Sequence, residues 1–204
     1  MKNRPLAFRE PKSWRSIQVV LATVAGLAVF EASLVPEPAL GQVLMTQPEA
    51  LRLAFPEPLN LERKTAFLDE EQLKRAQELA GSEVEVDQSV VTYYLASGDG
   101  AAAGVAYFDA HRVRTLPEVL MIVVTPEASI RRIEVLKFSE PPEYVAPEGW
   151  LEQFESQELT PHLLLKRSIV NMTGATLTSR AVTQASRRVL ALHEVIDPFN
   201  QRDD

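Results

Sequence analysis

The chain has 204 residues, of which 46% are hydrophobic, and its formal net charge is −7. This length can bury one substantial core, whereas the acidic charge gives no electrostatic footprint for nucleic acid. Cysteine is absent, which excludes disulfides, cysteine-ligated iron–sulfur clusters and thioether-linked haem.

Residues 1–41 have the pattern of a targeting segment rather than of a folded domain. Five basic residues precede an apolar run over residues 19–30, and Ala39 and Gly41 are small residues suited to a cleavage site. The run is short for a transmembrane helix, which needs about 20 apolar residues. We therefore expect a signal peptide, with a retained membrane anchor as the alternative. Either one places the remainder outside the cytoplasm, in the periplasm or on the outer face of the cytoplasmic membrane.

Residues 42–88 are expected to connect this segment to the main domain. Prolines are frequent at the start of the stretch, where a short apolar helix fits residues 50–55. A second helix is predicted from Asp69 to Ala80. Asp69 suits its N-cap, Gln72 occupies the capping-box position, and Gly81 is a typical stop.

Four segments with strand character follow, at residues 89–95, 105–111, 118–125 and 130–138. Short turns separate them, so we expect an antiparallel meander. The third segment is uniformly apolar, as in a central strand. The fourth alternates between charged and apolar residues and is expected to have one solvent-facing side. The predicted fold class is therefore α+β, an antiparallel sheet covered by helices.

A run rich in hydroxyl groups lies between an apolar segment, residues 163–170, and a periodic helix. It consists of Thr173, Gly174, Ala175, Thr176, Leu177, Thr178 and Ser179. From about Arg180 onward, apolar residues recur at three- and four-residue steps, which predicts an amphipathic helix. The order favours a strand, a tight loop and a helix start.

The end of this loop has features of an anion site. Free backbone N–H groups and the positive end of the helix dipole favour an anion. Gly174 permits close backbone approach, and the hydroxyls make phosphate the natural ligand. Lys166 and Arg167, just upstream, are candidates for neutralising its charge. An ordinary Ser/Thr helix cap after a turn is the alternative interpretation.

The order Thr-Gly-Ala-Thr-Leu-Thr-Ser resembles the flavinylation motif, Ser/Thr-Gly-Ala-Thr-x-Ser/Thr, of the FMN-binding domain family. This family includes the C subunit of the sodium-translocating NADH:quinone reductase and the G subunit of the Rnf electron-transport complex. The resemblance implies FMN joined through a phosphoester to Thr178, with residues 173–176 shaping the phosphate turn. The family usually has Asp where this chain has Val170, three residues before the motif, so covalent and noncovalent binding both remain open.

Glu140 matches the start of a second family segment, Glu-Thr-Pro-Gly-x-Gly, although the glycines are missing here. The resemblance implies that Glu140 lies near the flavin; a turn residue before prolines is the alternative. Trp150 and Phe154 follow, four residues apart, on a predicted short helix. Residues 89–204 would form the FMN-binding domain.

The resemblance implies an exported FMN-binding electron-transfer protein that exchanges electrons with membrane-bound redox partner proteins. A flavin transferase would attach the cofactor. Such a protein is closer to a subunit of a redox complex than to a stand-alone enzyme. Two alternatives stay open: a reductase that binds FMN noncovalently, and a cofactor-free extracytoplasmic binding module.

No catalytic side chain and no metal site are predicted. The histidines His111, His162 and His193 lack metal-ligand spacing, and we expect them at the surface or at helix ends.

Overall fold

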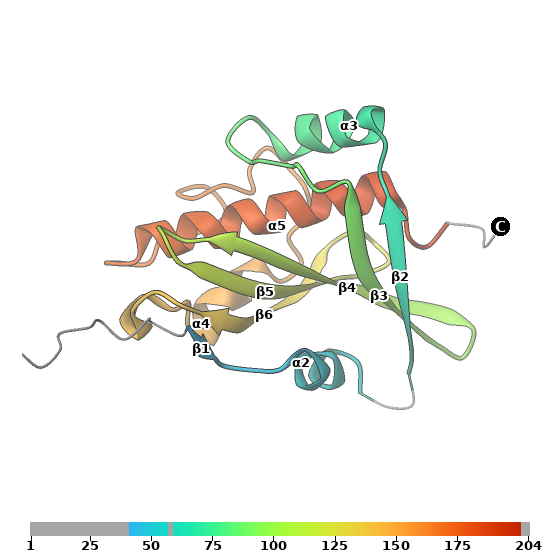
Figure 1. Cartoon of the computed structure of the whole chain (residues 1–204), viewed down its shortest axis with the longest axis horizontal. Helices are drawn as coiled ribbons and strands as arrows, with labels where there is room; N and C mark the ends of the chain where they lie inside the picture. Colours follow the sequence, from blue (N-terminus) through green and yellow to red (C-terminus); the bar gives the residue numbers. More distant parts are fainter. Residues whose placement is uncertain (1–40, 57–58, 201–204) are drawn as a thin grey trace, which may run out of the picture. The chain divides into compact units, whose positions relative to one another are not determined.

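The computed structural model describes residues 41–56 and 59–200 (Figure 1). The predicted signal or anchor segment, residues 1–41, lies outside this part except for its last residue. Within the described residues, no helix combines the length and hydrophobicity that crossing a membrane requires.

Six antiparallel strands form one sheet, in the order β1-β6-β5-β4-β3-β2. The strands are β1 (Gln42–Val43), β2 (Asn60–Phe67), β3 (Val90–Gly98), β4 (Ala101–Arg112), β5 (Pro117–Val124) and β6 (Ile130–Phe138). Strands β3 to β6 pair with their neighbours in chain order, which confirms the predicted meander and the α+β class. The segment expected only to connect, residues 42–88, also supplies both edge strands.

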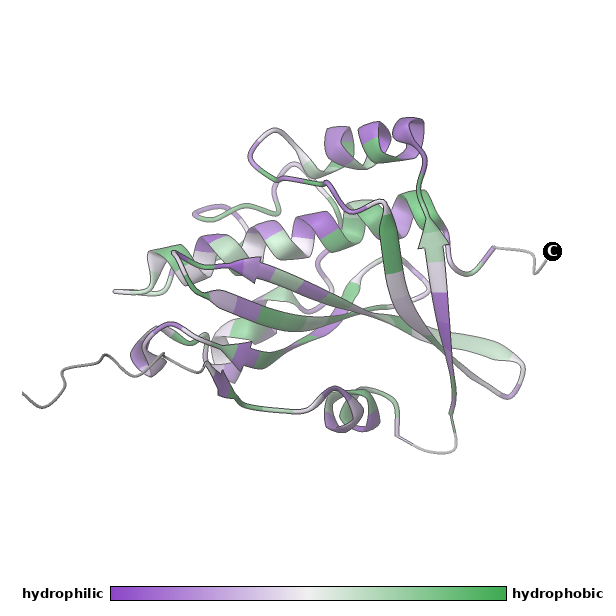
Figure 2. Ribbon diagram, in the orientation of Figure 1, coloured by the Kyte–Doolittle hydropathy of each residue, from purple (hydrophilic) through white to green (hydrophobic). Residues whose placement is uncertain are grey.

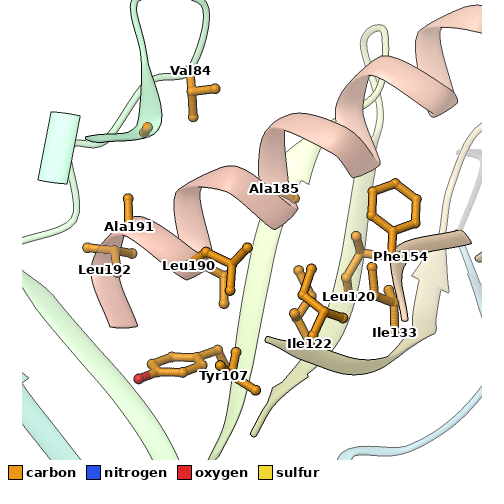
Figure 3. Packing of buried hydrophobic residues seen from close by; sticks show 14 of the residues in the cluster. Val84, Tyr107, Leu120, Ile122, Ile133, Phe154, Ala185, Leu190, Ala191 and Leu192 are labelled. Atoms are coloured by element: carbon orange, nitrogen blue, oxygen red, sulfur yellow. The ribbon is translucent and has the colours of Figure 1, made fainter. Parts of the chain in front are cut away.

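The helix α5 (Thr176–Ile196) lies along one face of the sheet (Figure 1). Its predicted apolar stripe is buried, and Ala185 packs in one cluster with Tyr107 and Ile122 of the central strands (Figure 3). The helix begins at Thr176, earlier than predicted. The hydroxyl-bearing residues at this end can be helical, because a Ser or Thr hydroxyl can bond to the backbone of the preceding turn. Here Ser179 Oγ donates to the carbonyl oxygen of Ala175, four residues earlier.

The helix α3 (Glu70–Ala80) has the predicted bounds and caps. The Asp69 side chain accepts a hydrogen bond from the Gln72 backbone, and the Gln72 side chain accepts one from the Asp69 backbone. This capping box fixes the start of the helix. Ala76 and Ala80 are fully buried where α3 packs on α5 (Figure 1), whereas hydrophilic residues prevail along its other sides (Figure 2).

The helix α2 (Gln47–Ala54) covers the other face of the sheet. Phe55, just after it, lies in a small apolar cluster with Met121 and Val123. Arg131 of β6 belongs to this face: its guanidinium lies 4.7 Å from the centre of the Phe55 ring, and it donates a hydrogen bond to the Ala54 carbonyl. The side of β6 expected to face solvent is therefore partly covered.

The strand predicted over residues 163–170 is absent. One isolated bridge joins Leu165 to Ile169, and the Lys166 N–H donates to the Ile169 carbonyl, so the segment folds back on itself. Leu163 and Ile169 are nevertheless fully buried in the α5 cluster. These apolar residues of the segment pack in the hydrophobic core, but the segment does not pair with the sheet.

His193 lies in the last turn of α5, as expected for a helix end, but it is buried. Its Nδ1 lies 3.0 Å from the Tyr107 hydroxyl oxygen. Burial lowers the pKa of His193 to about 4, so the imidazole is neutral at pH 7. This histidine is a core residue.

Candidate functional site

A pocket of about 410 Å³ gathers most of the residues that the sequence pattern singled out. Three separate parts of the chain line it: the β4–β5 loop, the segment after β6, and the entrance to α5. The lining residues are Val113, Arg114, Glu140, Pro141, Tyr144, Gly174, Ala175, Thr176, Leu177 and Thr178. The volume falls within the range of small-molecule sites, roughly 300–1,000 Å³.

The N-terminus of α5 forms part of this pocket and has no side-chain cap. The N-cap residue is Ala175, which carries no hydrogen-bond acceptor on its side chain. The Ser179 N–H donates to the Ala175 carbonyl at 3.0 Å, so the N–H groups of residues 176–178 precede the first bond of the helix. Uncapped N–H groups and the helix dipole make this end electropositive and suited to an anion.

Gly174 permits the sharp turn that leads into α5. Its φ is +82°, a left-handed conformation that side chains disfavour. A Cβ added there would meet no heavy atom of the protein within 4 Å. The glycine is therefore required by the backbone conformation, and the space beside it is open to a ligand.

Thr178 is among the residues that line the pocket, although it is only 1% exposed. Its hydroxyl donates a 2.8 Å hydrogen bond to the carbonyl oxygen of Tyr144, the last residue of a short 3-10 helix, η1 (Pro142–Tyr144). This bond orients the hydroxyl and ties the helix entrance to a second part of the wall.

The other three hydroxyls of the pattern have different surroundings. Thr176 lines the pocket, and its Oγ accepts a hydrogen bond from Asn171 Nδ2. Ser179 is fully buried; its Oγ accepts from the Met172 N–H and donates to the Ala175 carbonyl, so it stabilises the turn. Thr173 is exposed and is not among the lining residues. Of the four hydroxyl-bearing residues, Thr176 and Thr178 line the pocket.

Glu140 lines the pocket and also fixes the β4–β5 loop. Its Oε1 accepts hydrogen bonds from the backbone N–H groups of Thr115 (2.9 Å) and Leu116 (3.0 Å). The bond from the Thr115 backbone is the largest of the effects that lower the pKa of this carboxyl. Glu140 is therefore ionised at neutral pH, and it positions the loop that carries Val113 and Arg114.

The pocket combines one positive charge with an apolar rim. Among its lining residues, all in the described part of the chain, Arg114 is the one basic side chain. Tyr144 and Leu177 are 40% and 44% exposed, which leaves apolar surface at the opening. Lys166 instead lines a different depression with Arg180, and Arg167 donates to the Pro161 carbonyl. The site suits a ligand that joins an apolar ring system to an anionic group.

The sequence pattern did not identify Val113, Arg114 or Tyr144 as site residues. They come from segments that reach the pocket only through tertiary packing. A basic turn between two predicted strands was the available signal for Arg114, but basic turns are common on protein surfaces.

Residues 117–191 match the family model described as the FMN-binding domain. The matched region runs from the start of β5 into α5. It contains the pocket residues from Glu140 to Thr178, whereas Val113 and Arg114 precede it. A comparison with curated proteins finds no match.

Proposed function

Because residues 117–191 match the FMN-binding domain, which supports FMN as the cofactor, we propose that the chain is an exported electron-transfer flavoprotein. It would exchange electrons with membrane-bound redox partner proteins. The observation that carries the proposal is the pocket at the uncapped N-terminus of α5, within the matched region.

The residues of this pocket fit the two halves of FMN. The N–H groups of residues 176–178 and the Arg114 guanidinium suit the phosphate. Tyr144 and Leu177 offer apolar surface of the kind that covers an isoalloxazine ring. The open space beside Gly174 would allow the phosphate to approach the backbone. When bound, the flavin would supply the redox chemistry, and these residues would hold and orient it.

Electron transfer is favoured over substrate reduction by what lines the pocket. Its titratable side chains are Arg114, Glu140 and Tyr144, and the Glu140 carboxylate is already engaged by the β4–β5 loop. No histidine is among these lining residues of the described chain. A reductase that protonates its substrate needs a positioned acid, whereas an electron carrier does not.

We propose that the flavin is attached to Thr178. Thr178 lines the pocket two residues into α5, in the first turn that carries the free N–H groups. Attachment would form a bond between Thr178 Oγ and the FMN phosphorus and break the phosphoanhydride bond of a flavin dinucleotide. The nucleoside monophosphate half would depart as the leaving group, and the hydroxyl proton would leave to solvent. A flavin transferase would catalyse the step. Thr178 would exchange its hydrogen bond to the Tyr144 carbonyl for the ester bond.

Export is proposed from the basic and apolar pattern of residues 1–41. Protease added to intact right-side-out vesicles is expected to digest the domain after residue 41, and inverted vesicles should protect it. The opposite pattern would place the domain in the cytoplasm. Release by high salt would indicate that the targeting segment has been removed.

The electron-transfer role can be tested on flavin-loaded protein purified from its native membranes. After reduction with dithionite and removal of the excess, the protein is expected to be reoxidised rapidly by native membranes and only slowly in buffer under anaerobic conditions. Flavin-free Thr178→Ala protein is the control for membrane effects. Efficient turnover of soluble donors and acceptors by the isolated protein would instead favour the noncovalent reductase. A colourless protein would contradict both.

A further inference from the structure

Four charged side chains form a buried chain of contacts beneath α5. Arg188 Nε donates to Asp109 Oδ2 at 2.7 Å, and its Nη2 donates to Asp109 Oδ1 at 2.8 Å. His111 Nδ1 lies 2.8 Å from Asp109 Oδ1, and its Nε2 lies 2.9 Å from Glu118 Oε2. Glu118 is fully buried, and Asp109 is 2% exposed. His111 itself is partly buried, with its side chain 11% exposed, so the expectation that it lies at the surface is met only in part.

The geometry determines the charge of each group. Asp109 is ionised because hydrogen bonds from His111 and Arg188 outweigh its burial and lower its pKa. Burial disfavours the His111 imidazolium, but its hydrogen bonds to Asp109 and Glu118 prevail and raise the pKa to about 9. Both ring nitrogens therefore donate at pH 7. With Glu118 ionised, the two positive and two negative charges would leave the cluster neutral overall.

One atom of this cluster has no partner. Glu118 Oε2 accepts from His111, whereas Glu118 Oε1 is buried without a hydrogen bond in the described structure. An ionised oxygen in this position is poorly solvated, and burial raises the pKa of Glu118. Protonation at Oε1 would remove the unsolvated charge without breaking the bond to His111.

The cluster lies beside the flavin pocket. His111 and Arg112 line a solvent-facing depression of about 540 Å³, and the next two residues of the chain line the flavin pocket. On α5, Ala181 lines the depression and Thr178 lines the flavin pocket. Three residues of a helix rise about 4.5 Å, so the two sites are about one helical turn apart.

The depression exposes His111 and Arg188 of the cluster to solvent, and its rim is acidic. Glu83, Glu85 and Asp87 line it from the segment after α3, and Arg112 lines it from β4. The Arg188 Nη1 donates to the Glu85 carbonyl, which holds this segment against α5. In the described residues, the charged groups that contact His111 directly are Asp109 and Glu118, and Arg188 lines the depression with it. Carboxylates at an opening are suited to exchanging protons with water.

We propose that Glu118 is a proton-accepting residue that takes up one proton when the adjacent flavin accepts an electron. The inference rests on the proposed function. An external reductant supplies the electron, and one solvent proton enters through the depression and binds Glu118 Oε1. No bond to the flavin forms or breaks in this step. The cluster changes from neutral to +1, which offsets the charge added to the flavin, and oxidation releases the proton.

Infrared redox-difference spectroscopy on the full flavin-loaded chain, reduced with dithionite, tests the proposal. The expected result is a protonated-carboxyl band that appears on reduction, shifts in D₂O and vanishes in Glu118→Gln. The matched control Glu143→Gln removes an exposed carboxylate near the pocket and should keep the band. A reduced wild-type protein without this band, or a band that persists in Glu118→Gln, would overturn the assignment.

The midpoint potential gives a second readout. One proton bound per electron changes the potential by about 59 mV per pH unit for a one-electron step. The wild-type potential is expected to depend more steeply on pH than that of Glu118→Gln, in the pH range where Glu118 changes its protonation. Equal slopes in the two proteins would contradict the proposal even if both bind flavin normally.

A test on flavin-free protein separates this inference from the flavin assignment. NMR titration of the His111 ring should find an imidazolium at pH 7 and a lower pKa in Glu118→Gln. If the His111 imidazole of the wild-type protein is uncharged at pH 7, the cluster of four charged groups does not exist. The proposal for Glu118 then fails, whether or not the protein binds flavin. If His111 is charged but no flavin binds, the proposed function fails instead.

Discussion

The Thr178 hydroxyl donates a 2.8 Å hydrogen bond to the carbonyl oxygen of Tyr144. The residue that the family pattern marks for attachment therefore also connects α5 to the segment that follows β6. A phosphoester has no hydroxyl proton to donate, so the proposed attachment of FMN to Thr178 would end this contact. The proposal therefore predicts that flavin attachment and the position of the η1 segment are linked.

Gly174→Ala is expected to destabilise the protein by roughly 1–2 kcal/mol, because the φ of +82° is unfavourable for a side chain. It should also lower the flavin-to-protein ratio, since the added methyl group occupies the open space beside the phosphate position. Urea unfolding and the flavin absorbance of folded protein measure the two effects.

Gly149→Ala is the matched control for this change. An added Cβ there also meets no heavy atom within 4 Å, but Gly149 lies in the helix α4 (Glu148–Leu151) without a positive φ. We expect equal or slightly higher stability and unchanged flavin content. A Gly174→Ala protein with full flavin content would show that this turn does not contact the cofactor.

Arg114→Gln removes the one basic side chain of the pocket. FMN affinity, measured by fluorescence quenching on protein made without a transferase, should fall roughly 3- to 10-fold, or about 0.7–1.4 kcal/mol. The difference should shrink as salt is raised, because Arg114 is exposed. Lys74→Gln, the same charge change on α3, should leave affinity unchanged. Equal effects of the two substitutions would mean that Arg114 acts only through net charge.

Arg187 joins α5 to two other segments. It is 8% exposed and donates to the carbonyl oxygens of Ala80, Thr160 and Leu163. Arg187→Lys cannot reproduce this planar set of donors and should lower the free energy of unfolding by roughly 1–3 kcal/mol. Arg180→Lys, at an exposed position of the same helix, should change it by less than about 0.5 kcal/mol. Similar losses in both variants would argue against the carbonyl contacts as the cause.

The stability of the flavin-free protein should fall between pH 6.5 and pH 9. The folded pKa of His111, about 9, lies above its unfolded value of about 6.5. Protonated His111 therefore adds its full contribution to the free energy of unfolding below pH 6.5, and this contribution is lost as the pH rises through 9. Its size is roughly 2–4 kcal/mol. His111→Gln should flatten this part of the profile, whereas His162→Gln, at an exposed site, should keep it. Denaturant midpoints across the pH range decide between the two outcomes.

Elements determined by nearby residues could be predicted from the sequence. Asp69 and Gln72 cap α3 from three residues apart, and the meander follows from short turns between apolar strands. The strand β2 could not be recognised, because Glu62, Arg63 and Lys64 give it a polar character. It becomes a strand by pairing along its whole length with β3 at the sheet edge.

The candidate site also has one part that nearby residues determine and other parts that depend on contacts between distant segments. The α5 entrance is a continuous stretch, so the residue order alone was enough to predict it as a candidate site. The β4–β5 loop reaches the pocket through Glu140, which bonds to Thr115 from 25 positions away in the sequence. The buried contacts of His111 likewise require β4, β5 and α5 together. No local pattern contains such long-range contacts.

The central claim is that FMN occupies the pocket at the entrance of α5, joined to Thr178. Peptide mass spectrometry on protein produced with a flavin transferase tests it most directly. We expect the FMN mass on the peptide that contains Thr178, retained in Thr178→Ser and lost in Thr178→Ala, whose fold should persist because a single cap or hydroxyl contributes about 0.5–2 kcal/mol. An unmodified Thr178 peptide, or FMN on Thr176 or Thr173, would contradict the account.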